Sequence, residues 1–327
     1  MKVLVTGATS LIGQHVVQRL LGRGDSVSVL QRGPSGISGV QEVRCDLSSN
    51  CSSELQTALQ GQDAVVHLAA KVGVSGRWDA FESINVNGTQ NMVNSAREQG
   101  VSRFVHVSSP SVAHAGQSLV GSAEGLADPE NVRGHYARSK ALGEQIALHA
   151  NSDCMQVVSL RPHLVWGPGD TQLVQRIIDR AKAGRLQLVG SGQALIDTTY
   201  IDNAAAAIVA GIDNIDRAAG EALVISNGQP RTVSEIIHRI LRAAGLSVKL
   251  RKVPAPVAIT AGTVIEKVWE RLDREDDPPM TRFLAEQLAT AHWFDQRKTR
   301  TLLKWAPEVD LDEGFVRLAH SLGSQIK

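Results

Sequence analysis

The apolar residues in the first half of the chain form short runs separated by stretches with helical spacing. The run Val3–Val5 precedes residues 11–21, whose apolar positions repeat at helical intervals, and the run Val27–Leu30 follows. Further apolar runs lie at residues 40–43, 64–70, 104–107 and 155–160, with a helical pattern at 85–100 and another after residue 135. This alternation predicts an α/β fold with a doubly wound parallel sheet, the Rossmann fold. The third run contains Gln41 and Glu42, which places its strand near the sheet edge.

The second half has longer helical patterns. We expect a helix over 173–183, a short strand over 186–190, and a segment from 196 that returns to the core and leads into a helix over 204–212. Pro254–Arg274 is amphipathic, with an apolar face made of Val257, Ala261, Val264, Ile265, Val268, Trp269 and Leu272, and a charged stop at residues 273–279 ends it. That face either packs on the rest of the protein or forms a lid or surface-seeking helix for a long apolar substrate.

Composition excludes several classes of function. The chain has 327 residues, of which 43% are apolar, and a net charge of +1, which argues against a general electrostatic grip on nucleic acid. No apolar run is long enough to span a membrane, and the N-terminal strand runs into a glycine turn, unlike a secretory signal. Three cysteines without metal-ligand spacing predict a reduced cytoplasmic protein with Cys154 buried.

A glycine turn follows the first strand. Gly7 and Gly13 flank Ser10, just before the first helix, where backbone N–H groups can face a pyrophosphate. Ser10 replaces the glycine usual at the middle position. Either the turn has lost tight dinucleotide binding, or the small hydroxyl is tolerated and contacts a phosphate itself.

The end of the second strand indicates which dinucleotide binds. NAD-binding units usually place a carboxylate there, but this chain has Gln31 and Arg32. Arg32 can pair with a 2′-phosphate, which favours NADP(H); the alternative is an exposed arginine in the turn before Gly33. Asp46 follows the third strand and can either accept a bond from an adenine amino group or cap a helix that starts near Ser48.

Tyr136 and Lys140 are the strongest candidates for chemistry. Four residues apart on a predicted helix, they share one face, and a neighbouring ammonium would lower the phenol pKa. A phenol tuned in this way can exchange a proton with a carbonyl oxygen. Ser108 and Ser109 end the preceding strand, so their hydroxyls should lie at the same sheet edge. Taken alone, the Tyr and Lys pair also fits an ordinary exposed helix face.

The order of these motifs resembles the extended short-chain dehydrogenase/reductases. The motifs are the glycine turn, Asp46-Leu47, Leu68-Ala69-Ala70, residues 85–89, Ser108-Ser109, Tyr136 to Lys140, and Arg161-Pro162 with residues 166–169. Residues 107–112, 200–203 and 280–284 resemble the 3β-hydroxysteroid dehydrogenase branch. Together with residues 166–170 they resemble the bacterial 2-alkyl-3-oxoalkanoate reductases of olefin biosynthesis.

The resemblance implies a role for each matched residue. Tyr136 matches the proton donor and acceptor, and Lys140 the residue that lowers the tyrosine pKa and binds the nicotinamide ribose. Ser109 matches the hydroxyl that holds the carbonyl oxygen, with Ser108 as the neighbouring alternative. The implied cofactor-binding residues are Gly7, Ser10, Leu11, Ile12, Gly13, Arg32, Asp46, Leu47, Leu68, Ala69, Ala70, Asn85, Tyr136, Lys140, Pro162 and Leu164.

The resemblance also implies a smaller C-terminal α/β substrate domain. We expect residues 1–170 and 196–226 in the dinucleotide-binding domain, and 171–195 and 227–327 in the substrate domain. His163, Trp166 and Tyr200 are expected in the substrate pocket, and the alternative for each is core or interface packing. A homodimer would form through the helices at 85–100 and 136–150. The face from Val257 to Leu272 would dock on a membrane surface or a partner enzyme.

The predicted function is an NADP(H)-dependent reduction of the 3-keto group of a large apolar substrate. A 2-alkyl-3-oxoalkanoate is the favoured substrate, and a 3β-hydroxysteroid or sterol is the alternative within the same chemistry. A nucleotide-sugar epimerase or dehydratase shares the fold, but Pro110 and Ser111 stand where dehydratases need carboxylates. A non-catalytic dinucleotide sensor would have lost Tyr136 or Lys140, and both are present.

Overall fold

The first structural layer is a seven-stranded parallel sheet. The computed structural model describes residues 1–327 except 50, 74–75, 115, 273–277 and 325–327. Along the sheet the strands are β12 (Ala222–Ile225), β7 (Gln156–Pro162), β5 (Arg103–Val107), β4 (Ala64–His67), β1 (Lys2–Thr6), β2 (Ser26–Gln31) and β3 (Gln41–Arg44). The predicted doubly wound fold is confirmed, and β3 lies at the edge as its polar residues indicated. The strand order reverses between β1 and β4, where such sheets bind ligands beyond their carboxyl ends.

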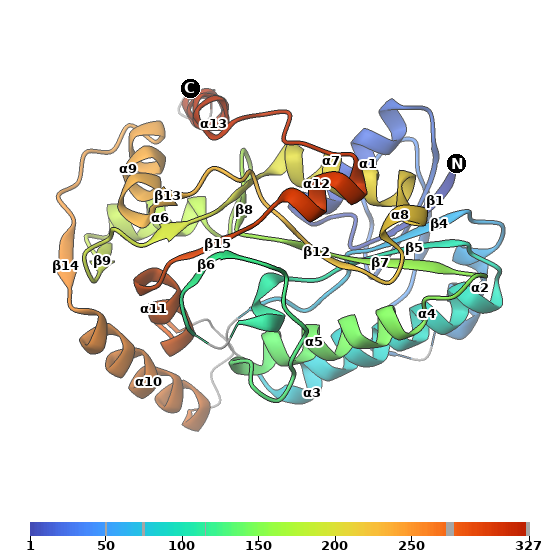
Figure 1. Cartoon of the computed structure of the whole chain (residues 1–327), viewed down its shortest axis with the longest axis horizontal. Coiled ribbons are helices and arrows are strands. Elements are labelled where there is room, and N and C mark those ends of the chain that lie inside the picture. The colour runs from blue at the N-terminus through green and yellow to red at the C-terminus, as the bar shows by residue number, and fades with distance from the viewer. Residues whose placement is uncertain (50, 74–75, 115, 273–277, 325–327) are drawn as a thin grey trace.

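Helices cover both faces of this sheet (Figure 1). One face packs on α1 (Leu11–Gly22), α7 (Ile201–Asp213), α8 (Ile215–Ala218) and α12 (Arg297–Leu303). The other packs on α2 (Ser52–Leu59), α4 (Gly88–Glu98) and α5 (Gly134–His149). Apart from the polar edge strand β3, the strands between them are mostly apolar and buried, as parallel strands covered on both sides must be. The sequence-based division assigns α12 to the substrate domain, yet Thr299 and Leu303 contact the large sheet.

A second core lies beyond the carboxyl edge of the sheet, on the left of Figure 1. Its helices are α6 (Val174–Lys182), α9 (Val233–Ala243) and α13 (Leu311–Ser324). Its strands are β6 (Leu119–Ser122), β8 (Val165–Trp166), β9 (Gln187–Val189), β10 (Leu195–Ile196), β11 (Thr199–Tyr200), β13 (Arg231–Thr232), β14 (Arg251–Val253) and β15 (His292–Phe294). Because β15 pairs with β6, the C-terminal part of the chain lies directly beside the segment that follows β5.

The amphipathic helix α10 (Ala255–Arg271) exposes most of its predicted apolar face. Val257, Val264, Val268 and Leu272 are all more than 40% exposed. The helix packs instead through its small residues, because a Cβ on Gly262 would lie 2.6 Å from the backbone of Thr281, just before α11 (Arg282–Ala289). The alternative in which the whole apolar face packs on the protein is therefore wrong, although Ile265 and Trp269 are half-buried. The charged stop of α10 falls largely outside the described residues.

The expectations that the cysteines are all reduced and that Cys154 is buried were wrong. Cys45 and Cys51 form a disulfide around the turn that contains Asp46, and Cys154 is exposed. Cys51 lies six positions after Cys45, and no periodic pattern in the sequence indicates that the turn brings the two thiols together. Among the described helices, none is both long and apolar enough to cross a membrane.

Candidate active site

Ser109, Tyr136 and Lys140 come together at the carboxyl end of β5. Ser109 lies two residues after the strand and caps the short 3-10 helix Pro110–Ala113, and its hydroxyl interacts with the Tyr136 phenol. The Lys140 ammonium, one turn further along α5, donates to the Val107 carbonyl at 2.7 Å. Ser108 is buried, and its hydroxyl has no partner among the described residues. Of the two candidate serines, the structure therefore joins Ser109 to the tyrosine.

Sequence reasoning missed a third hydroxyl beside this pair. The Ser111 hydroxyl lies 3.0 Å from the Ser109 hydroxyl, and the Ser111 backbone N–H donates to the same oxygen. Both bonds fix the Ser109 side chain in the turn that follows β5. The sequence contained the signal, since Ser109 and Ser111 are two residues apart around a proline that begins a helical turn.

Burial governs the pKa values of the tyrosine and the lysine. Burial raises the Tyr136 pKa above its usual value of 10.0, and the Ser109 hydrogen bond opposes that rise. Burial lowers the Lys140 pKa from 10.5 to about 8, and the Glu144 carboxylate opposes that fall. The expectation that Lys140 lowers the phenol pKa is thus not met, because the ammonium is directed to the Val107 carbonyl. A phenol with a raised pKa stays protonated at neutral pH and remains a proton donor.

A buried ion pair fixes the helix that carries Tyr136 and Lys140. Glu144 continues their helix face, and it accepts bonds from Arg161 Nε and from the Ser159 hydroxyl, both at 2.9 Å. Arg161, on β7, also donates to the carbonyls of Glu124 and Gly125 in the segment before α5. Both ionic side chains are 1% exposed. The pair therefore ties α5 to the sheet and to the preceding loop.

The glycine turn has the geometry of a phosphate cradle. Gly7 has a φ of +68°, and a Cβ there would meet the Ala69 backbone nitrogen at 2.9 Å, so a side chain would clash with the segment that follows β4. The Ser10 hydroxyl donates to the Gly7 carbonyl at 2.8 Å and accepts from the Gly13 N–H at 3.0 Å. Ser10 therefore stabilises the turn through its own hydrogen bonds. Neither the loss of dinucleotide binding nor a direct contact with phosphate, the two alternatives for this serine, describes that role fully. The first turn of α1 stays open to an anion.

The adenosine end of the candidate site also fits a dinucleotide. Gln31 is buried at the end of β2, and its Oε1 has no partner among the described residues, which leaves an acceptor for a hydroxyl group. Arg32 is exposed and close enough to attract the Asp46 carboxylate. Asp46 itself caps the turn at Ser48, whereas α2 begins later, at Ser52. The residues present therefore fit a nicotinamide dinucleotide across the β1–β4 crevice.

Thr6, His67 and Thr89 form a buried chain of hydrogen bonds behind the cofactor loop. Thr89 donates to the Asn85 carbonyl at 2.8 Å, so it accepts from His67 Nε2. The neutral ring then accepts at Nδ1 from the Thr6 hydroxyl, which in turn accepts the Ala69 N–H at 3.0 Å. This chain places Leu68, Ala69 and Ala70 beside the glycine turn.

Asn85 lies within a π-helical turn, Glu82–Asn87, that the sequence did not predict. The helix starts earlier than expected, at Trp78, and the π turn rotates Asn85 inward, where it is 2% exposed. Its amide holds both backbone groups of Lys71 and donates to Ser139 on α5 at 2.8 Å. Asn85 therefore joins the end of the β4 loop to the helix of Tyr136.

The predicted substrate-pocket residues lie in different surroundings. Trp166 and Tyr200 are buried in the second core, where Trp166 stacks on Phe315 and donates to the Thr198 hydroxyl at 3.0 Å. His163 is 6% exposed, next to Leu164, whose φ of +42° is unusual for a branched residue. Pro162 ends β7, so Pro162, His163 and Leu164 lie at the carboxyl edge of the sheet.

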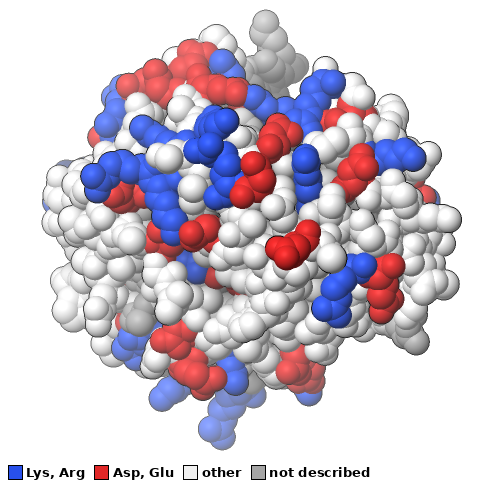
Figure 2. All heavy atoms as spheres, turned by 45° about the vertical axis from the view of Figure 1, so that its right-hand side comes forward, with Lys and Arg blue, Asp and Glu red and all other residues white. Residues whose placement is uncertain are grey.

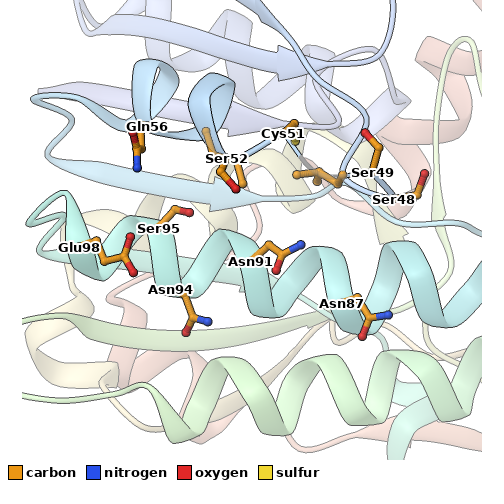
Figure 3. Close-up of a pocket in the computed structure, with 12 residues that line it drawn as sticks. Ser48, Ser49, Cys51, Ser52, Gln56, Asn87, Asn91, Asn94, Ser95 and Glu98 are labelled. Carbon is orange, nitrogen blue, oxygen red and sulfur yellow. The ribbon is translucent and has the colours of Figure 1, made fainter.

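A hollow of about 570 Å³ lies between α2 and α4, beside the turn that contains Asp46 (Figure 3). Its lining is mostly neutral and polar, with Asn91 and Asn94 on α4, Asn87 at the end of the preceding π-helical turn, and Ser48 and Ser49 on the turn after β3. Over the face drawn in Figure 2, basic and acidic side chains are interspersed, in keeping with the net charge of +1. Neither feature indicates a nucleic-acid site.

Comparison with known proteins agrees with this geometry. Residues 3–226 match the model of the NAD dependent epimerase/dehydratase family. The chain belongs to this family. A 2-alkyl-3-oxoalkanoate reductase of Stenotrophomonas maltophilia (strain K279a) is 39% identical to this chain, and the match covers 98% of this chain and 99% of the length of that protein. A protein of the same name from Shewanella oneidensis is 36% identical over 97% of this chain and 85% of its own.

More distant relatives widen the range of chemistry. A 3beta-hydroxysteroid-dehydrogenase/decarboxylase isoform 2 of Arabidopsis thaliana is 31% identical, over 88% of this chain and 54% of its own. The UDP-glucuronic acid 4-epimerase of Bacillus cereus, solved with NAD, has a TM-score of 0.76 at 24% identity over the full length of both chains. That likeness shows the fold. The protein is an extended short-chain dehydrogenase/reductase, an oxidoreductase that uses a nicotinamide cofactor.

Proposed function

We propose that the protein is an NADP(H)-dependent reductase of the 3-keto group of 2-alkyl-3-oxoalkanoates. The observation that carries the proposal is the Ser109–Tyr136 hydroxyl pair in a chain that matches, over nearly its whole length, two relatives named for this activity. The preference for NADP(H) rests on Arg32 and on a neutral Gln31 where NAD-binding units have a carboxylate.

The side chains supply the proton and the charge stabilisation. A bound nicotinamide supplies a hydride to the carbonyl carbon, and negative charge then grows on the oxygen. Tyr136 donates its proton to that oxygen, and Ser109, held by Ser111, donates a hydrogen bond to it. Lys140, with a pKa of about 8, is mostly cationic at neutral pH, and its proposed role is to donate to the hydroxyls of the nicotinamide ribose.

Two expectations about partners belong to the same proposal. A homodimer would use α4 and α5. The exposed face of α10, from Val257 to Leu272, would meet a membrane surface or a partner enzyme that delivers the long-chain substrate.

The test is oxidation of NADPH by the purified protein with three substrates. A synthetic 2-alkyl-3-oxo acid, a 3-ketosteroid and UDP-glucuronic acid are compared at equal concentrations. We expect turnover of the 2-alkyl-3-oxo acid with kcat/KM at least about tenfold above that of the steroid. Turnover of the steroid without the acid would contradict the proposal, as would epimerisation of the nucleotide sugar with no net loss of NADPH.

A further inference from the structure

Three buried histidines lie where the Ser109 turn meets the second core. His114 follows the short helix that Ser109 caps, His163 follows β7, and His292 belongs to β15. They are 3%, 6% and 2% exposed. The His292 ring lies 4.9 Å from the His163 ring and 6.2 Å from the His114 ring, centroid to centroid. The reduction chemistry described above uses none of the three.

The hydrogen bonds of His292 determine the proton positions on His163. His292 Nε2 lies 2.9 Å from the Gln287 carbonyl, which can only accept, so Nε2 carries the proton. In the neutral ring, Nδ1 is then an acceptor, and it lies 2.8 Å from His163 Nε2. His163 therefore donates from Nε2 and keeps a lone pair at Nδ1. That Nδ1 has no hydrogen-bond partner among the described residues.

His114 leaves a donor without a partner. Its Nδ1 accepts the Gly116 N–H at 3.0 Å, so the neutral ring carries its proton on Nε2. His114 Nε2 is buried and has no partner within the described part of the chain. A buried donor left unsatisfied costs free energy, which a bound acceptor recovers.

The electrostatic setting keeps the cluster neutral without a ligand. Burial lowers the pKa of all three rings, to about 4 for His292 and well below 6.5 for His163. Two ionic groups, Glu286 and Arg133, act on the His114 pKa in opposite directions, and their charged atoms lie 3.0 Å apart. An anion brought next to His163 would therefore meet little competing charge.

We propose that His163 and His114 form the binding site for the carboxylate of the 3-oxo acid, with His292 holding His163 ready to gain a proton. When the acid binds, one proton from water adds to His163 Nδ1, and the resulting imidazolium donates to one carboxylate oxygen. The Nε2–H of His114 donates to the same carboxylate. No bond of His292 has to change, because His163 already donates from Nε2. The site rests on the proposed function, since it recognises the acid group of that substrate class.

Two substitutions separate this role from a structural one. In His163→Gln the amide nitrogen replaces Nε2 and keeps the bond to His292, but the group that gains the proton is lost. In His114→Asn the amide oxygen replaces Nδ1 and keeps the bond to Gly116, but the Nε2–H donor is lost. His238→Gln, on the exposed surface of α9, is the matched control.

The first measurement is calorimetric binding of the 2-alkyl-3-hydroxy acid to the cofactor-loaded protein in buffers of different ionisation enthalpy. We expect uptake of about one proton per acid bound at neutral pH. The methyl ester should bind with no uptake, and so should the acid in His163→Gln. Binding of the acid without proton uptake by the unaltered protein, or no binding of it, would overturn the proposal. Proton-coupled binding without reduction of the keto acid would leave the site standing and reject the proposed function.

The second measurement is KM for the keto acid and for its methyl ester. We expect His163→Gln and His114→Asn each to raise KM for the acid roughly 10- to 100-fold, the effect of losing a hydrogen bond to a charged group. KM for the ester and every constant of His238→Gln should stay within about twofold. An equal rise for acid and ester would assign the cluster a purely structural role and refute the proposal.

Discussion

Replacing Lys140 by methionine should stabilise the protein at neutral pH while it abolishes activity. Lys140 is 4% exposed, and burial lowers its pKa from 10.5 to about 8. Each pKa unit corresponds to about 1.4 kcal/mol, so holding the ammonium in the folded state costs roughly 3 kcal/mol at pH 7. The lost bond to the Val107 carbonyl offsets about 1 kcal/mol of that gain. We therefore expect Lys140→Met to raise the free energy of unfolding by roughly 1–3 kcal/mol.

The pH dependence of this gain has a definite sign. The unfolded chain keeps the lysine proton up to pH 10.5, whereas the folded protein releases it near pH 8. Above pH 8 the unfolded state binds more protons, so the wild-type protein gains stability as the pH rises. The variant lacks this gain, and its advantage should shrink by about 1.4 kcal/mol per pH unit above pH 8.

Urea unfolding followed by tryptophan fluorescence measures both effects between pH 7 and pH 9.5. Lys249→Met, at an exposed lysine in the loop after α9, is the control and should change the free energy of unfolding by less than about 0.5 kcal/mol. The reasoning fails if Lys140→Met is less stable than the wild type at pH 7, or if the difference between them does not change above pH 8.

Three further substitutions test the other parts of the site. Tyr136→Phe should lower kcat/KM for the keto acid by about 10²- to 10⁴-fold with an unchanged unfolding midpoint, and a smaller loss would exclude it as the proton donor. Arg32→Asp should lower the preference for NADPH over NADH about 10- to 100-fold in steady-state kinetics, and an unchanged ratio would mean that Arg32 does not contact a 2′-phosphate. Glu144→Gln should destabilise the fold by roughly 3–5 kcal/mol in urea, because it leaves Arg161 charged and buried; the double variant with Arg161→Met should recover most of that loss, and no recovery would refute the ion-pair explanation.

Local patterns predicted the residues whose neighbours are close in sequence. Tyr136 and Lys140 share a helix face because they are four residues apart, and the turn at Gly7 directly follows a strand. The helical spacing and the order of strands and helices along the chain were therefore enough to predict that these residues lie at one edge of the sheet. Ser109 could be assigned to the same edge because it ends the next buried strand. The roles given to these residues remain predictions, but their proximity was visible in the chain.

Contacts between distant segments could not be predicted in this way. The sequence predicts Arg161 in a strand and Glu144 in a helix, but it does not predict that the two side chains form a buried ion pair in the folded protein. The three histidines come from segments far apart in sequence and meet because β15 pairs with β6. For α10, the spacing of apolar residues predicted the helix correctly but not the side of it that packs. Small residues such as Gly262 determine that side, because they allow the close approach to Thr281.

Transfer of deuterium from labelled NADPH tests the central claim most directly. The protein is incubated with a 2-alkyl-3-oxo acid and NADPH that carries deuterium at both positions of the nicotinamide C4, and the product is analysed by mass spectrometry. The account predicts a 2-alkyl-3-hydroxy acid with one deuterium at C3, and almost none of it with Tyr136→Phe. Unlabelled product, or no product while UDP-glucuronic acid is epimerised, would contradict it.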